Sequence, residues 1–153
     1  MTQAKTDWHA RARALAINGR AFINGRYVAA ASGATFECVS PIDGRILAQV
    51  ASTDVADADL AVAAARQAFE SGAWSRLPPR ERKRVLLRFA GLIERHAEEL
   101  ALLETLDMGK PIADSLKVDV PSAARCIQWY AEAIDKLYDE VAPTGPRSLA
   151  TIT

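Results

Sequence analysis

The sequence has few of the residues that build crosslinked or metal-bound sites. Its 153 residues include two cysteines, Cys38 and Cys126, and two histidines, His9 and His96. The cysteines are far apart in sequence and no histidine stands beside either, which argues against a disulfide framework and against a zinc site. We therefore expect a reduced, cytoplasmic protein whose histidines lie at the surface or at helix ends.

Net charge and long apolar runs are also lacking. The 19 lysines and arginines balance 19 aspartates and glutamates, so no net field attracts nucleic acid or an anionic membrane. No apolar run approaches the roughly 18 residues that cross a bilayer, and the amino terminus carries no signal pattern. We expect a soluble protein with no nucleic-acid or membrane partner.

Catalytic motifs are absent as well. The chain has neither the glycine-rich turn that binds a dinucleotide nor a P-loop. Cys126 falls within an apolar helical pattern and is predicted to be a core residue, and Cys38 lies in a predicted strand without a base. By itself the chain is predicted to hold no catalytic residue and to bind no cofactor.

Helical periodicity is the strongest positive signal, most clearly over Glu98–Ile112. Three leucines recur there at helical spacing, and Gly109 followed by Pro111 ends the helix. A second amphipathic run, Ser122–Tyr138, is predicted to pack against it. Half of the residues are hydrophobic, which is enough for one ordinary core.

Capping and breaking residues predict further helices. Thr6 is expected to cap a short helix through Ile17, a second helix covers Thr53–Glu70, and Pro78-Pro79 opens a third. Residues 112–119 are also expected to be helical, and Pro121 either kinks this helix or restarts it. The third helix is predicted to bury Val85, Leu86, Phe89 and Ile93. Apolar stripes also run along the second helix, through Ala58, Ala61, Val62, Ala65 and Phe69, and along the run at 122–138, through Ala123, Ile127, Tyr130, Ile134 and Leu137.

A basic run, Arg80–Arg84, lies on the outer side of the third of these helices. It is either a phosphate-binding patch or a solvated helix face, and the interleaved Glu81 favours the solvated face.

Turn residues predict two hairpins. Asn24-Gly25 suits a type I′ turn, and strands over Thr35–Val39 and Ile46–Val50 flank a proline- and glycine-containing reversal. Pro143, Gly145 and Pro146 form a turn-rich link to a β-prone segment, Ser148–Thr153, and we expect the chain to stop within a fold. The predicted fold class is mostly α with peripheral β-hairpins.

Four segments of this sequence resemble the amino-terminal third of NAD(P)-dependent aldehyde dehydrogenases. They are FINGRYV at 22–28, SPIDGRILAQV at 40–50, AVAAARQAFESGAW at 61–74 and LETLDMGKP at 103–111. HAEELALLETLDMGKPI followed by WYAEAIDKLYDEVA is similar to the γ-glutamyl-γ-aminobutyraldehyde dehydrogenases of putrescine breakdown.

The resemblance implies the amino-terminal part of the α/β aldehyde dehydrogenase fold, as a single truncated domain. Residues 1–50 would form a helix and β-hairpin arm, 51–140 a helical layer of the cofactor-binding domain, and 141–153 the start of an oligomerisation strand. The full-length enzyme would use NAD or NADP to oxidise an aldehyde through a thiolate adduct and a thioester. It would be a homo-oligomer, a dimer or a tetramer.

The resemblance also implies two sites. Val118, Asp119 and Ser122 would line the mouth of the substrate tunnel, where Asp119 would recognise a distal amine; alternatively Asp119 is a solvated residue near a helix kink. The Val39 carbonyl and the Asp107 carboxylate would hold a monovalent cation; alternatively Asp107 caps or hydrogen-bonds the end of its helix.

Two function classes are compatible with these patterns. The chain is part of an aldehyde dehydrogenase, or it is a noncatalytic interaction module derived from that family, which adds its strand at 148–153 to the sheet of a partner.

Overall fold

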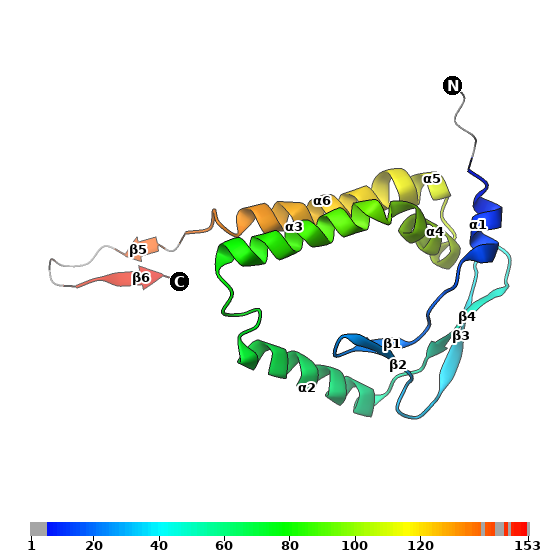
Figure 1. The fold of residues 1–153 in the computed structure, drawn as a ribbon, viewed down its shortest axis with the longest axis horizontal. Coiled ribbons are helices and arrows are strands. Elements are labelled where there is room, and N and C mark those ends of the chain that lie inside the picture. The colour runs from blue at the N-terminus through cyan, green and yellow to red at the C-terminus, as the bar shows by residue number, and fades with distance from the viewer. Residues whose placement is uncertain (1–5, 139, 143–145, 147, 153) are drawn as a thin grey trace, which may run out of the picture.

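The computed structural model describes residues 6–138, 140–142, 146 and 148–152, which form an open ring of helices and short strand pairs (Figure 1). In chain order the elements are α1 Trp8–Ala14, β1 Ala21–Ile23, β2 Arg26–Val28, β3 Thr35–Val39, β4 Ile46–Ala51, α2 Val55–Ser71, α3 Pro79–Arg95, α4 Ala97–Met108, α5 Ile112–Asp114, the π-helical turn η1 Ser115–Asp119, α6 Val120–Ala133, β5 Glu140–Ala142 and β6 Ala150–Ile152. The prediction of a mainly helical chain with small β-hairpins is confirmed. Among the described helices, none is long and apolar enough to cross a membrane.

The strands form three separate antiparallel pairs, β1–β2, β3–β4 and β5–β6. Asn24 and Gly25 both have positive φ, 51° and 78°, so the predicted turn between β1 and β2 is confirmed. The β3–β4 pair matches its predicted bounds within one residue, and its register shifts between Cys38 and Val39. Gly19 runs against β4, and a Cβ atom there would lie 2.1 Å from the Gln49 carbonyl oxygen.

Helix α1 begins one residue later than predicted and ends three residues earlier. Asp7, not Thr6, caps it, because the Asp7 carboxylate accepts the Ala10 amide at 3.0 Å. The helix stops at Ala14 because Leu15 adopts an extended conformation.

A reciprocal capping box starts α2. The Asp54 carboxylate accepts the Ala56 amide at 2.9 Å, and the Asp57 carboxylate accepts the Asp54 amide at 3.2 Å. A second bond, from the Ala31 amide to Asp57 at 2.9 Å, ties the helix to the link between β2 and β3. Gly72, with φ of 77°, ends the helix as predicted.

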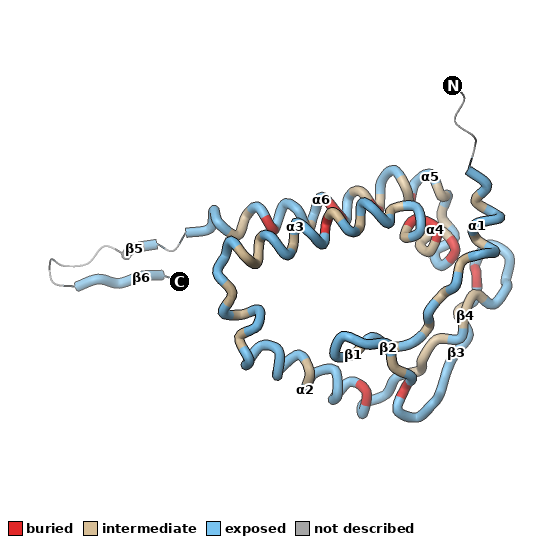
Figure 2. The backbone as a smooth tube through the Cα atoms, viewed as in Figure 1, coloured by how far each residue is buried: buried red, intermediate tan, exposed pale blue. Residues whose placement is uncertain are grey.

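The apolar stripe of α2 lies on the surface of the described structure. Ala58, Ala61, Val62, Ala65 and Phe69 are all exposed, and the buried residue of α2 is Asp57 (Figure 2). No described element packs on that face, because α2 and the α3–α6 pair lie on opposite sides of the ring (Figure 1).

The core lies where α3, α4 and α6 meet (Figure 2). Ala90 of α3 and Ala124 and Ala131 of α6 are buried, since alanines let two helices approach closely, and α4 contributes buried apolar residues beside them. Leu86 and Ile93 of the predicted α3 stripe are half-buried, whereas Val85 and Phe89 are exposed.

Several predictions for α6 are wrong. The helix ends at Ala133 and does not reach Tyr138. Cys126 is exposed, so the prediction of a core cysteine is also wrong. Of the apolar stripe at 123–137, Tyr130 and Leu137 are 62% and 81% exposed, whereas Ile127 and Ile134 are half-buried. The buried side of α6 follows Ala124, Ile127, Ala131 and Ile134, which recur every three or four residues, and Tyr130 lies outside it.

The carboxyl-terminal strand pair extends away from the ring (Figure 1). Strand β6 confirms the predicted strand within 148–153, and β5, which was not predicted, pairs with it through Ala142 and Ala150. Pro143 and Gly145 of the predicted turn lie outside the described residues.

Candidate functional site

The segment between α5 and α6 is a π-helical turn. The Val120 amide donates to the Ser115 carbonyl five residues back, which is one residue wider than an α-helical turn. Pro121, the second residue of α6, follows one residue after this turn; proline has no amide to donate and its ring crowds the carbonyl four residues back. The wider turn accommodates this proline, and the backbone stays helical from η1 into α6.

Two contacts tie this turn to α4 and to the loop after it. At its start, the Ser115 hydroxyl is fully buried and lies 3.0 Å from the Thr105 hydroxyl. At its end, Lys110 Nζ donates to Asp119 Oδ2 at 2.7 Å and lies 3.4 Å from Glu104 Oε1. The hydrogen bond to Asp119 raises the pKa of Lys110, so this lysine stays charged.

The structure places the predicted tunnel residues on consecutive turns, Val118 and Asp119 at the end of η1 and Ser122 at the start of α6. Val118 is 55% exposed, and the Ser122 hydroxyl accepts a bond from Arg125 at 3.1 Å. The Asp119 side chain is 35% exposed and ion-paired with Lys110, and its role at the tunnel mouth stays a prediction. Lys110 was missed at the sequence level, although its place just after the helix-ending Gly109 sets it beside the next helical segment.

Of the predicted cation pair, Asp107 faces β3. Cys38 Sγ donates to Asp107 Oδ1 at 3.3 Å, and this bond raises the pKa of the thiol. Both side chains line a hollow of about 440 Å³, whereas Val39 does not line it. The described partner of Asp107 is therefore the thiol, not the end of α4.

Metal-binding and nucleophilic chemistry find little support among the described residues. No group of three or more His, Cys, Asp or Glu side chains in residues 6–138, 140–142, 146 and 148–152 is placed to hold a metal ion. A raised pKa keeps Cys38 protonated, which is the opposite of what a nucleophilic thiolate requires.

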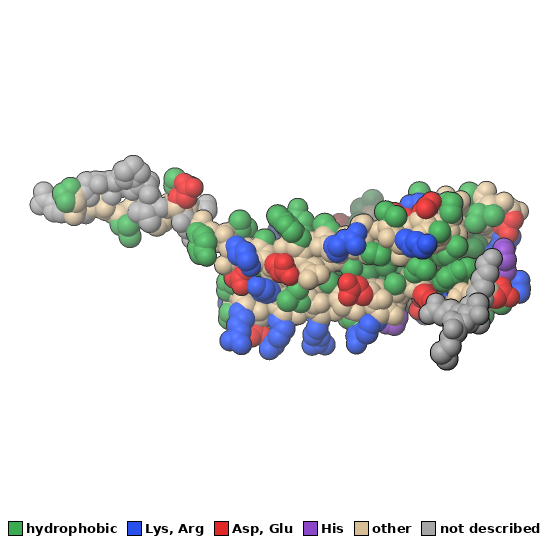
Figure 3. Space-filling view, turned by 90° about the horizontal axis from the view of Figure 1, so that it is seen from above, with side chains coloured by type: hydrophobic (Ala, Val, Ile, Leu, Met, Phe, Trp, Pro, Cys, Tyr) green, Lys and Arg blue, Asp and Glu red, His purple; other side chains and the backbone are tan. Residues whose placement is uncertain are grey.

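The basic run at 80–84 carries ion pairs. Lys83 Nζ lies 2.7 Å from Asp135 Oδ2, and Arg84 pairs with Glu81 on the same helix. Figure 3 shows a row of basic side chains along one edge of the helical body. These pairs argue against a free phosphate-binding patch, but Glu81, Arg82 and Lys83 are half-buried, so the run is only in part a solvated helix face.

Comparison with known proteins identifies the class. Residues 27–153 match the model of the aldehyde dehydrogenase family, and the chain belongs to this family. The resemblance found in the sequence motifs is thereby confirmed.

Three matched proteins show how similar the chain is to individual members of the family. The NADP/NAD-dependent aldehyde dehydrogenase PuuC of Escherichia coli is 56% identical over 145 residues, which are 95% of this chain and 29% of the relative. The indole-3-acetaldehyde dehydrogenase of P. syringae, solved with NAD+, is 65% identical with a TM-score of 0.95, over 96% of this chain and 30% of that one. The γ-glutamyl-γ-aminobutyraldehyde dehydrogenase of Burkholderia cenocepacia is 59% identical with a TM-score of 0.90, over 91% of this chain and 28% of that one. The chain thus spans less than a third of the length of these relatives.

Proposed function

We propose that this chain is the amino-terminal part of an aldehyde dehydrogenase that oxidises an aminoaldehyde, such as γ-glutamyl-γ-aminobutyraldehyde, to the acid with NAD or NADP. The family match along residues 27–153 is the main support for this proposal. The chain also covers only 29% of the length of PuuC, as expected for one part of a larger enzyme. The relatives support the cofactor, since one is named as NADP/NAD-dependent and another was solved with NAD+.

The two structural neighbours differ in the aldehyde that names them. One is named for an indole aldehyde and the other for an aldehyde with an amino-acid group. The carboxylate of Asp119 favours the aldehyde with an amino-acid group. A partly desolvated carboxylate attracts a distal ammonium, and it has no such charge attraction to a neutral indole ring. In this proposal Val118, Asp119 and Ser122 line the mouth of the substrate tunnel.

Asp119→Asn in the complete enzyme that carries this segment tests the substrate class. We expect kcat/KM to fall for a cationic aminoaldehyde and to stay unchanged for a neutral aliphatic aldehyde of similar length and for indole-3-acetaldehyde. A charge-assisted contact of this kind typically contributes roughly 1.5 to 3 kcal/mol, or about 10- to 100-fold in efficiency. An equal change for all three substrates would rule out Asp119 as the specificity residue.

Within that enzyme, this chain is a structural part. NAD supplies a hydride acceptor when bound, but the described residues form no glycine-rich turn to hold it and no activated thiol. The 153-residue chain alone is therefore expected to form no NADH from an aldehyde. Aldehyde-dependent NADH formation that Cys126→Ser abolishes would contradict this expectation.

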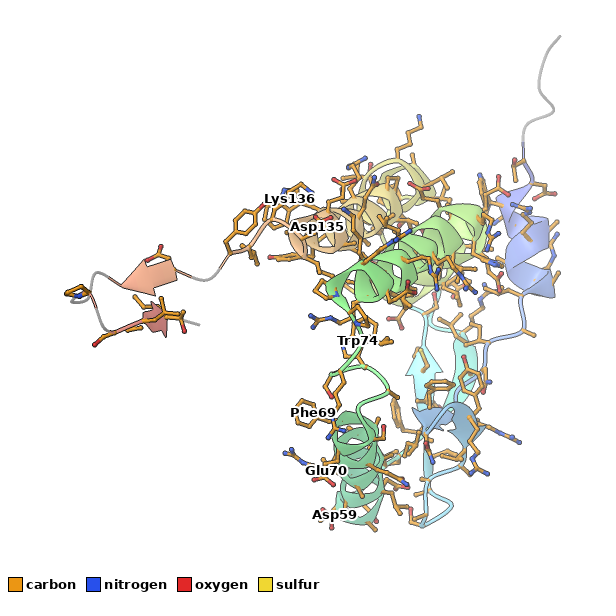
Figure 4. All side chains as sticks on the ribbon, turned by 60° about the vertical axis from the view of Figure 1, so that its left-hand side comes forward. Asp59, Phe69, Glu70, Trp74, Asp135 and Lys136 are labelled. Atoms are coloured by element: carbon orange, nitrogen blue, oxygen red, sulfur yellow. The ribbon has the colours of Figure 1, made fainter. Side chains whose placement is uncertain are left out.

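Exposed apolar side chains support the proposal that this chain is part of a larger fold. Phe69 and Trp74, at and just beyond the end of α2, are 60% and 42% exposed, and hydrophobic side chains lie between the charged ones over the helical body (Figures 3 and 4). We infer that the rest of an aldehyde dehydrogenase chain covers them. The isolated chain should self-associate, and a sharp monomeric peak in light scattering with cooperative melting would count against this.

The β5–β6 pair supports an oligomer, because a strand with an unpaired edge readily adds to another sheet. Leu149 and Ile152 are both exposed there. We infer a cytoplasmic homo-oligomer, a dimer or a tetramer, whose contacts include this pair. The same edge is what a stand-alone interaction module would use, and stable monomeric expression of the 153-residue chain would favour that second function.

A further inference from the structure

Lys110 is the charged group paired directly with the predicted specificity residue. We propose that Lys110 is a specificity-determining positioning residue, which pairs with Asp119 and thereby limits the attraction of that carboxylate for a cationic aldehyde. The inference rests on the proposed function of Asp119 at the tunnel mouth. Lys110 lies nine positions before Asp119 in the sequence, and in this proposal it sets how strongly the Asp119 carboxylate attracts a cationic substrate.

The backbone brings Lys110 to this place. Gly109, with φ of 74°, ends α4 in the left-handed conformation, and Pro111 is the N-cap of α5, so Lys110 lies in the tight turn between the two helices. From there its side chain reaches Asp119 at 2.7 Å. A continuous α-helix in place of η1 would rotate the downstream helix α6 by about 100°, so the contact at the junction depends on the π-helical turn.

Charge counting gives the direction of the effect. The carboxylates of Glu104 and Asp119 carry two negative charges and the Lys110 ammonium one positive charge, which leaves one net negative charge. Without the lysine, two negative charges would stand at the same place. The three side chains are 40%, 35% and 33% exposed, so water and salt screen them in part and the change in substrate preference is moderate.

The experiment compares variants of the complete enzyme by one ratio, kcat/KM for a cationic aminoaldehyde divided by kcat/KM for a neutral aldehyde of similar length. Lys110→Met should raise this ratio by roughly two- to fivefold at low salt, and the increase should shrink at high salt. Lys110→Arg keeps the charge and should leave the ratio near that of the wild type. Lys83→Met is the matched control, because Lys83 makes an ion pair of the same length, 2.7 Å, with Asp135, just past the end of α6.

The double variant Lys110→Met/Asp119→Asn separates positioning from general damage. If Lys110 acts through Asp119, the double variant has the same ratio as Asp119→Asn alone. A change in Lys110→Met that is equal for both substrates, or a ratio unchanged from the wild type while Asp119→Asn lowers it, would overturn the inference and leave the proposed function standing. If Asp119→Asn itself leaves the ratio unchanged, the proposed role of Asp119 fails, and the inference about Lys110 fails with it.

Discussion

Asp57 is the residue whose loss should most clearly loosen α2. Its side chain is buried, with an exposure of only 3%, and its carboxylate accepts two backbone amides, from Ala31 at 2.9 Å and from Asp54 at 3.2 Å. One bond closes the capping box and the other holds the β2–β3 link against the helix. Asp57→Ala removes both acceptors and leaves two amides without their partner.

The expected cost comes from these two bonds. Removing a helix cap costs about 0.5 to 2 kcal/mol, and a hydrogen bond to a charged group contributes about 1.5 to 3 kcal/mol. We expect Asp57→Ala to lower the free energy of local opening at Ala31 by about 1.5 to 3 kcal/mol, which is roughly a 10- to 100-fold faster amide exchange. Asp57→Asn keeps one carbonyl acceptor and should cost less.

Hydrogen exchange followed by mass spectrometry measures this directly in peptides that contain Ala31. Asp59→Ala is the matched control, because Asp59 is an exposed aspartate two residues further along the same helix (Figure 4). If exchange at Ala31 is the same in Asp57→Ala, Asp59→Ala and wild type, the two bonds do not hold the link to α2.

Three further predictions concern packing, charge and ion binding. Gly19→Ala should strongly destabilise the chain because its Cβ would meet a carbonyl oxygen of β4 at 2.1 Å, whereas Gly91→Ala, in open space on α3, should stabilise it by about 0.5 to 1 kcal/mol in urea unfolding. The hydrogen bond from Lys83 holds the pKa of Asp135 at about 2, below the ordinary 3.8, so the stability from this contact is present above pH 3.8 and is lost as the pH falls toward 2. A carboxyl titration by NMR should show that value, and Lys83→Met should raise it toward 3.8. If the Asp107 carboxylate holds a monovalent cation in the complete enzyme, potassium should raise the melting temperature of the wild type and not that of Asp107→Ala; potassium-insensitive melting of both would remove the cation role.

Residues that favour a positive φ predicted the ends of their elements well, whereas the predicted ends of α1 and α6 were wrong. Asn24-Gly25, Gly72 and Gly109 each require or favour a positive φ, and each ends its element where the sequence indicated. Such residues act through their own backbone, so no knowledge of the surrounding fold is needed.

Burial was predicted less well, because it depends on what packs against a face. The apolar stripe of α2 is a property of the sequence, but its cover is not part of the described structure. On α6 the buried side passes through Ala124 and Ala131, each one position from a residue of the stripe read from the sequence, and the small size of these alanines lets α3 approach closely.

In the candidate site, too, some features were predictable from local sequence and others depended on the surrounding fold. The positions of Asp119 and Ser122 near a proline-altered helix were predictable from their spacing. No residue pattern indicated that the segment would widen into a π-helical turn, since Pro121 is compatible with a kink, a restart or a wide turn. The pairing of Asp119 with Lys110 depends on that choice and on the turn at Gly109.

The wide turn also decides where this part of the chain tolerates a change in length. A π-helical turn holds one residue more than an α-helical turn, so a deletion of one codon within residues 115–119 can restore an ordinary turn and leave α6 close to its present rotation and position, at the expense of crowding at Pro121. A deletion of one codon inside α6, between Ala124 and Ala131, has no extra residue to absorb it, and it would turn the rest of the helix by about 100° and shift it by about 1.5 Å along the axis. Ala131 would then leave its buried position, so a deletion within α6 should be far more damaging than one within residues 115–119.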